Sequence, residues 1–379
     1  GAPEAGARLC RLDPARTASI LEQTRSLASQ GMRVLGVACA SHRGREWPVT
    51  PEGFAFTWLG LVGLADPIRP EVPQAVAECR RAGIRVVMVT GDYPETARAI
   101  AHDAGLDSDR VVNGAEMERL DEDALRGVVR NVSVFARILP VQKLRLVNAL
   151  KSNGEVVAMT GDGVNDAPAL KAAHIGISMG ERGTDVAREA SSLVLLKDDF
   201  TSIVHAVRLG RRIYDNLRKA VTYVVAAHIP IAGMTLLPLL FGTPLAFFPI
   251  HIVFLEMIIN PACAIVFEGE QGENDSMRQP PRGTRESLLG PGTMLHAVLQ
   301  GVGLLAAVAV IFFSSLEAGQ RPEQARALAF TSLVLGNIGL ILANRSLGKS
   351  MLKMVRIPNR AQWWIAGGTA AALAAAVWT

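Results

Sequence analysis

Over residues 1–201, short apolar runs alternate with segments in which apolar residues recur every three or four positions. The runs have the length and the valine and isoleucine content of buried strands, and the segments between them have helical periodicity. Such an alternation indicates a parallel sheet with helices on both faces. We expect strands at 33–40, 54–64, 84–90, around 111, 132–137, 156–160, 175–179 and 193–196, and helices at 70–82, 94–104, 121–129, 140–151 and 166–173.

After Ser202 the pattern changes to long apolar segments. A partly charged helix at 202–219 runs without a clear break into the first of them, and each is near the roughly 20 residues that a helix needs to cross a bilayer. We therefore expect an α-helical transmembrane bundle at 202–379, after the α/β part. Its five predicted crossings are 220–241, 246–267, 293–314, 327–343 and 362–378.

Two of the connections between these crossings are polar or basic. The segment after the second crossing is polar, and the one after the fourth carries five basic residues and no acid. By the positive-inside rule both connections lie in the cytoplasm, on the same side as the α/β domain. The sequence thus predicts a multi-pass integral membrane protein.

Composition supports a membrane part and excludes several other classes of protein. The hydrophobic content of 49% is high for a soluble enzyme. The net charge of +4 comes without basic residues interleaved with aromatic ones, so we expect no nucleic-acid partner. The four cysteines are far apart, which argues against structural zinc and against a disulfide scaffold. The chain begins without a methionine and stops in an apolar run, so we expect a piece of a longer protein.

Polar residues follow three of the predicted strands, where a ligand crevice forms in an open parallel sheet. Thr90 and the amide of Gly91 could hold phosphate oxygens, and Asp162 and Asp166 suit a hard cation such as Mg²⁺. Lys143 adds a point charge for a phosphoryl group. Each element alone could be an ordinary turn or a solvated helix residue, but together in this order they describe phosphoryl transfer assisted by magnesium.

The stretch TGDGVNDAPAL resembles the signature of the P-type ATPases, pumps that pass through an aspartyl-phosphate. GLVGLADPIRPEV, GIRVVMVTGD, FARILPVQK and the run from Met159 to Lys219 resemble the same family, so that the resemblance covers about residues 55–270. The pattern is most similar to the calcium-transporting branch. It implies a Rossmann-like sheet of the haloacid-dehalogenase type, with a C-terminal remnant of the nucleotide-binding domain at 1–65, the phosphorylation domain at 66–201 and the membrane domain at 202–379.

The resemblance also implies roles for individual residues. Asp162 would ligate Mg²⁺, Asn165 and Asp166 would order the phosphate site, and Lys143 would neutralise phosphoryl oxygens that Thr90 and Gly91 bind. On the nucleotide side, Asp92 would lie near the phosphate site, Asp66 and Arg69 would form the hinge and contact ATP, and Arg33 would lie near the nucleotide phosphates.

Several hallmarks of the family are absent from these 379 residues. The DKTGT segment with the nucleophilic aspartate, the TGE loop and the first four membrane spans do not occur. The resemblance therefore implies a C-terminal fragment of a pump of the bacterial inner membrane, which uses ATP and Mg²⁺, is inactive alone and needs its missing N-terminal part. The alternatives are a membrane-anchored non-catalytic nucleotide-binding or regulatory subunit, and a membrane-anchored phosphatase, which would need an aspartate nucleophile on a strand and for which we find no DxD or DKTGT candidate on a predicted strand.

Ionisable groups inside the predicted spans mark candidate transport residues. His228, Glu256 and Asn260 are such groups, and Pro230 and Pro261 nearby could expose carbonyl oxygens. Alternatively, His228 caps a kink and Glu256 is protonated and hydrogen-bonded to a neighbouring span. Calcium is doubtful, because Ile231, Phe254 and Met257-Ile258 stand where calcium pumps carry ligands, so Mg²⁺, Mn²⁺, another cation or H⁺ remain open. Asn337 and Asn344 could add oxygens.

Overall fold

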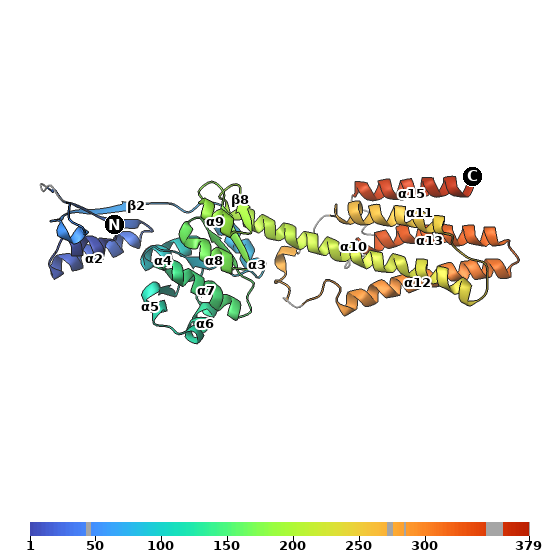
Figure 1. The fold of residues 1–379 in the computed structure, drawn as a ribbon, viewed down its shortest axis with the longest axis horizontal. Helices are drawn as coiled ribbons and strands as arrows, with labels where there is room; N and C mark the ends of the chain where they lie inside the picture. The colour runs from blue at the N-terminus through green and yellow to red at the C-terminus, as the bar shows by residue number, and fades with distance from the viewer. Residues whose placement is uncertain (43–46, 271–275, 284–285, 346–358, 379) are drawn as a thin grey trace. The chain divides into compact units, whose positions relative to one another are not determined.

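The computed structural model describes residues 1–42, 47–270, 276–283, 286–345 and 359–378 (Figure 1). Contacts divide the chain into two compact units. The first, here called the α/β unit, comprises Gly1–Ala206 and Met277–Pro281, and the second, the membrane unit, comprises Val207–Ser276 and Arg282–Thr379. The contacts thus place residues 1–65 in the same unit as the predicted phosphorylation domain, and the division between those two stays a prediction.

The α/β unit begins with two helices and a hairpin. Helices α1 (Pro3–Leu9) and α2 (Pro14–Ala28) precede β1 (Arg33–Cys39), which pairs antiparallel with β2 (Thr57–Leu64); a 3₁₀ turn, η1 (Pro51–Gly53), lies between the strands. The carboxylate of Asp13 accepts a hydrogen bond from the N–H of Arg16 at 2.9 Å and so caps α2.

Six short parallel strands carry the polar segments of interest. β3 (Met88–Val89), β4 (Val111–Asn113) and β5 (Val134–Ala136) form one sheet in the order β3-β5-β4, and β6 (Ala158–Gly161), β7 (Ile175–Met179) and β8 (Leu193–Leu195) form another in sequence order. The predicted parallel strands occur, but in the part of the chain that the structure describes they form two three-stranded sheets instead of one. β3 and β6 are edge strands there, because neither has a hydrogen-bonded strand on its second side.

Helices connect these strands, as a parallel sheet requires. The predicted helices occur, and two short helices that were not predicted, Gly114–Glu118 and Asp185–Ala190, occur besides them. Buried side chains of Phe135, Met117 and Leu125 hold the first sheet against its helices. The helices are α3 (Val72–Arg81), α4 (Pro94–Asp103), α5 (Gly114–Glu118), α6 (Glu122–Asn131), α7 (Pro140–Ser152), α8 (Ala167–Ala172), after the 3₁₀ turn η2 (Val164–Asp166), and α9 (Asp185–Ala190).

The membrane unit consists of long helices, and four helices of the described chain are long and apolar enough to cross a membrane. They are α10 (Phe200–Leu240), α11 (Pro249–Pro261) with its π-helical continuation η3 (Ala262–Phe267), α12 (Pro291–Glu317) and α13 (Pro322–Asn344). The fifth predicted crossing is also a helix, α15 (Arg360–Trp378), but it is not one of these four. A 3₁₀ turn, η4 (Ser276–Arg278), precedes α12.

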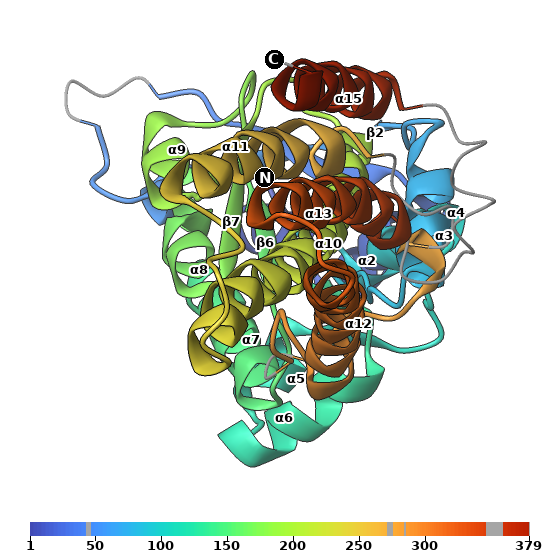
Figure 2. The same ribbon diagram turned by 90° about the vertical axis from the view of Figure 1, so that its right-hand side faces the viewer.

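Small residues bring these helices into close contact. A Cβ added to Gly336 of α13 would lie 2.3 Å from the Leu304 side chain of α12, and one added to Gly233 of α10 would lie 2.5 Å from Leu305. α13 lies between α12 and α15 (Figure 2). Near the ends of these helices, Arg345 and Glu270 form a buried ion pair at 2.8 Å. The hydrophobic core of this unit is large, and buried polar side chains such as Asn337 and Asn344 lie among its helices.

Candidate functional site

The loop after β6 places two predicted site residues beside a third from a different helix. The Nζ of Lys143, in the first turn of α7, lies 2.6 Å from Oδ1 of Asp166, and Asp166 is 6% exposed. The other carboxylate oxygen of Asp166 accepts a hydrogen bond from the N–H of Gly163 at 3.3 Å. A Cβ on Gly161 would lie 2.5 Å from the Cβ of Asp166, so this loop closes over Asp166 only with glycine there.

Asp162 begins the same loop and has a different environment. Its side chain is exposed, and among the described residues it has no recorded ion pair or hydrogen bond. Its backbone oxygen accepts a hydrogen bond from the N–H of Thr184 at 2.9 Å. An exposed carboxylate on a fixed backbone fits Mg²⁺, which is usually bound by one or two carboxylates together with waters and phosphate oxygens. No group of three or more His, Cys, Asp and Glu side chains that could hold a metal occurs in the described part of the chain.

The segment after β3 joins Thr90 and Asp92 to Arg33. The Oγ1 of Thr90 donates to Oδ2 of Asp92 at 3.1 Å, and Oδ1 of Asp92 lies 3.7 Å from Nε of Arg33. Both side chains of this ion pair are partly exposed, Arg33 more so than Asp92. Arg33 and Asp92, both predicted to face the nucleotide, are therefore neighbours.

Strand direction places these groups at one edge. β3 pairs parallel with β5, so the segment after Val89 and the segment that leads into α7 leave the sheet on the same side. Lys143 of α7 in turn contacts Asp166, which follows β6. Thr90, Lys143 and Asp162 thus follow the carboxyl ends of β3, β5 and β6, the last of which belongs to the second sheet, and such strand ends are where ligands bind in open α/β folds. Gly91 and Asn165 lie in these same segments, and Asn165 is exposed.

The two hinge residues lie elsewhere on the unit. Asp66 is exposed between β2 and α3. The guanidinium of Arg69 donates to the backbone oxygen of Asp198, just before α10. Arg69 therefore ties the segment after β2 to the segment after β8, and its contact with ATP stays a prediction.

Residues that sequence reasoning missed join the N-terminus to this edge. Arg137, directly after β5, has a left-handed backbone (φ 53°), and its Nη1 lies 2.6 Å from Oε1 of Glu4. The hydroxyl of Tyr93 donates to the same carboxylate, and the Arg137 guanidinium lies 4.7 Å from the centre of the Tyr93 ring. Burial and the neighbouring Glu4 raise the pKa of Tyr93 to about 12. The only sequence signal is that Tyr93 follows the predicted strand 84–90 and that Arg137 ends the predicted strand 132–137.

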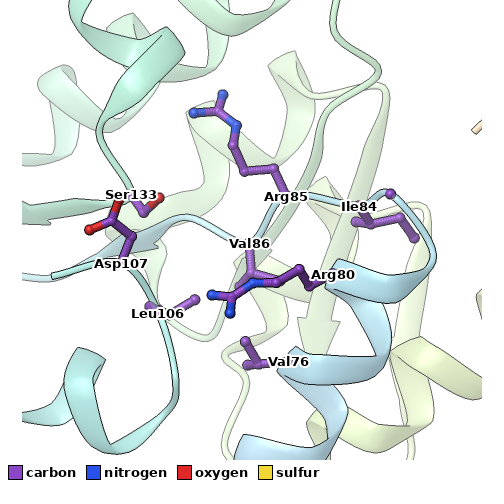
Figure 3. A pocket seen from close by; sticks show the side chains of 9 residues that line it. Val76, Arg80, Ile84, Arg85, Val86, Leu106, Asp107 and Ser133 are labelled. Carbon is purple, nitrogen blue, oxygen red and sulfur yellow. The ribbon is translucent and has the colours of Figure 1, made fainter. Parts of the chain in front are cut away.

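A cavity of about 300 Å³ lies at the opposite edge of the first sheet (Figure 3). Ser133 precedes β5, and residues 84–86 precede β3, so this cavity is at the amino ends of the strands. Its two arginines are already engaged, because Arg80 donates to the carbonyl of Gly105 and Arg85 to that of Val129, both at 2.6 Å. The cavity is therefore separate from the candidate phosphate site.

We expect Lys143 and Asp166 to stabilise each other in the folded chain. Replacing Asp166 by asparagine should lower the local free energy of opening of the β6 loop and α7 by roughly 1–3 kcal/mol, between the values for exposed and for buried pairs. Hydrogen exchange followed by mass spectrometry over 140–172 measures it. The Lys143→Met/Asp166→Asn double variant should recover part of the loss. Strictly additive effects of the two changes would contradict a direct pair.

In the membrane unit, two of the three candidate transport residues meet across helices. Nε2 of His228 in α10 lies 3.2 Å from Oε1 of Glu256 in α11, and Asn260 lies one turn after Glu256 on the same helix. Nδ1 of His228 lies 2.8 Å from the carbonyl oxygen of Val224, which can only accept, so Nδ1 carries a proton. Nε2 then accepts from a protonated Glu256, or donates when the imidazole is charged. The pair can thus share a proton between Nε2 and the carboxylate. Without that proton, both atoms could act as ligands to a cation.

Asn337 of α13 is fully buried, and neither of its amide atoms has a hydrogen-bond partner among the described residues. Asn344, two turns further along, donates to Oε1 of Gln300 of α12 at 2.9 Å. Asn344 thus has a side-chain hydrogen-bond partner among the described residues, whereas Asn337 has none.

Replacing Asn337 by leucine should stabilise the chain. An unsatisfied buried amide costs about 1–3 kcal/mol, so we expect a higher midpoint of thermal unfolding in detergent. The matched change Asn344→Leu should lower the midpoint, because it leaves the Gln300 amide oxygen without its donor. A midpoint that falls for both variants would show that Asn337 has a polar partner in solution.

Comparisons with known proteins cover both units. Residues 23–174 match the family of haloacid dehalogenase-like hydrolases, and residues 244–379 match the family described as cation transporting ATPase, C-terminus. The two matched segments contain the strand-edge residues and the helices from α11 onwards, respectively.

Full-length relatives match across the boundary between the units. The calcium-transporting ATPase of Bacillus subtilis is 41% identical over 321 residues, which is 83% of this chain and 36% of the relative. Calcium-transporting ATPase 1 of Lactococcus lactis is 38% identical over 344 residues, 89% of this chain and 38% of the relative. The probable cation-transporting ATPase F of Mycobacterium tuberculosis is 37% identical over 373 residues, which is 96% of this chain and 41% of the relative. The chain thus spans about two fifths of the length of these relatives.

Proposed function

We propose that the chain belongs to the cation-transporting P-type ATPases and that it forms most of the phosphorylation domain and part of the membrane domain of an ATP-driven cation pump. In the proposed reaction a phosphoryl group passes from ATP to an aspartate outside this chain. The observation that carries the proposal is the cluster at the strand edge, where Lys143 contacts Asp166 beside the exposed Asp162.

Each residue of the cluster has a task that its environment supports. Bound Mg²⁺ would neutralise charge on the transferring group, and Asp162 would hold it. Lys143, kept in place by Asp166, would stabilise negative charge on the phosphoryl oxygens. Thr90 and the amide of Gly91 would orient those oxygens. Arg33 and Asp92 would lie on the nucleotide side.

The sheet edges favour a further strand from the rest of the protein. β3 and β6 each have one side without a pairing strand in the described chain, and the segments that follow them carry Thr90 and Asp162. A strand inserted between them would satisfy both rows of backbone groups and would end at the same edge. We propose that this strand carries the nucleophilic aspartate. The chain alone would then bind phosphate and Mg²⁺ without turning over ATP.

For the transport step we propose that His228, Glu256 and Asn260 contribute to a cation site. Two of these three side chains are in contact, and all three lie in helices that are predicted to cross the membrane. A histidine next to a carboxylate can exchange a proton for a metal cation, because both groups lose a proton when they become ligands. The cation could be calcium, as in the names of two relatives, or another cation including H⁺.

The proposed function is tested by phosphorylation of the complete protein. Membranes that contain it should form an acid-stable phosphoprotein from radiolabelled ATP in the presence of Mg²⁺, and hydroxylamine should release the label because an acyl phosphate is cleaved by it. Chelation of Mg²⁺ should abolish labelling. Absence of a hydroxylamine-sensitive label, with transport intact, would exclude an aspartyl-phosphate mechanism.

A further inference from the structure

The loop Gly180–Thr184 lies between the loop after β6, which carries Asp162, and the segment before α10. It follows β7, which pairs parallel with β6 on one side and β8 on the other, so all three strands end at the same edge. Asp162 follows β6, and Asp198 follows β8. The loop is therefore flanked by one acidic residue on each side.

On the metal side the loop fixes the backbone of Asp162. The N–H of Thr184 donates to the carbonyl oxygen of Asp162 at 2.9 Å. The Thr184 hydroxyl at the same time accepts from the N–H of Ala187 at 3.3 Å and caps α9. Thr184 is thus fixed by its hydrogen bond to the first turn of α9, and its own N–H fixes the backbone of Asp162.

On the other side the carboxylate of Asp198 accepts two hydrogen bonds from the loop backbone. Its Oδ1 accepts from the N–H of Glu181 at 3.0 Å and its Oδ2 from the N–H of Arg182 at 2.9 Å. Asp198 is 9% exposed. Burial by itself would raise the pKa of this carboxyl, but backbone N–H groups of residues 180–182 and the charge of Arg182 lower it below its ordinary value. The side chain is thus an anion whose partners are the loop amides.

Close packing leaves the loop little room for another conformation. A Cβ on Gly180 would lie 2.3 Å from the carbonyl oxygen of Leu195, and one on Gly183 would lie 1.9 Å from that of Met179. Both approaches are possible only for glycine. The loop backbone is pressed against β7 and β8 while Asp198 holds its amides.

We propose that Asp198 is a positioning residue for the magnesium site, acting on Asp162 through the loop Gly180–Thr184. This inference rests on the proposed function, in which Asp162 ligates the metal. Residues that orient a metal ligand without touching the metal commonly change its affinity about 10- to 100-fold when removed. Asp199, the next residue, makes its hydrogen bonds within the first turn of α10, with the N–H of Thr201 at 2.8 Å, so the two adjacent carboxylates have separate tasks.

The test measures metal binding by the full 379-residue chain in detergent. Mn²⁺ serves as the probe, because free Mn²⁺ is counted by electron paramagnetic resonance and Mg²⁺ can compete with it. Asp198→Ala should weaken Mn²⁺ binding about 10-fold or more. Asp198→Asn should weaken it less, since one oxygen still accepts an N–H bond, and this variant gives the same readout if Asp198→Ala does not fold. Asp199→Ala should lower the thermal midpoint and leave the metal affinity unchanged.

The variants also separate this inference from the proposed function. Asp162→Asn should abolish binding of Mn²⁺ at the site. If this variant kept the full affinity for Mn²⁺, Asp162 would not be the metal ligand that we propose. If Asp162→Asn loses binding while folded Asp198→Ala and Asp198→Asn bind Mn²⁺ within twofold of the parent chain, Asp198 does not position the site. Equal loss of affinity in Asp198→Ala and Asp199→Ala would likewise overturn it, because general destabilisation would then explain both.

Discussion

In the complete protein, for which we propose ATPase activity, Asp162→Asn should reduce ATP hydrolysis by about 10²- to 10³-fold. The asparagine keeps the shape of the side chain but removes the charge that would hold Mg²⁺, and a metal that stabilises a transferring phosphoryl group contributes several kcal/mol to the transition state. The exposed position of Asp162 means that its removal leaves no buried group unpaired. We therefore expect a loss of activity without a loss of folding.

The measurement is the rate of phosphate release from ATP by purified protein over a range of Mg²⁺ concentrations. Asp123→Asn is the matched control, because Asp123 is an exposed carboxylate on α6 that forms an ion pair with Arg126 of the same helix at 3.3 Å. It should leave the rate unchanged. Wild-type turnover by Asp162→Asn at limiting Mg²⁺ would show that the metal is held elsewhere.

Glu256→Gln should weaken stimulation of the ATPase by the transported cation about 10- to 100-fold. A hydrogen bond or ligand bond that involves a charged group contributes about 1.5–3 kcal/mol, and glutamine can keep a hydrogen bond to His228 but cannot supply the negative charge that a cation ligand needs. The concentration of cation for half-maximal stimulation should rise, whereas phosphorylation at the strand edge should keep its dependence on Mg²⁺. The split between the two quantities separates a transport residue from a catalytic one.

A panel of cations in the assay identifies the ion at the same time. Glu317→Gln is the control, since Glu317 is an exposed acid at the end of α12. Stimulation that is unchanged in Glu256→Gln would remove this residue from the transport site. A shift for H⁺ alone, seen as a changed pH dependence of the rate, would identify the pair His228–Glu256 as a proton carrier.

Much of the fold was readable from the chain because its signals are local. A proline stands at the start of α4, α7 and α12 and marks where each helix begins. The helical periodicity that follows is likewise set by residues only three or four positions apart. The long apolar segments after Ser202 all proved to be helices, and the length of a bilayer span is itself a local property. The residues that follow β3 and β6 could be singled out for the same reason, since a strand end and its next residues are contiguous.

The sequence by itself determined the α/β domain, the helical membrane part, the family resemblance and the strand-edge candidates. Only the tertiary structure decided that the parallel strands of the described chain form two sheets, that Arg69 contacts Asp198, that Nε2 of His228 lies next to Glu256, and that Asp198 holds the loop beside Asp162. The physical reason is separation along the chain. These contacts join residues between 16 and 129 positions apart, and whether such groups meet depends on the packing of whole helices and strands, which no local pattern encodes.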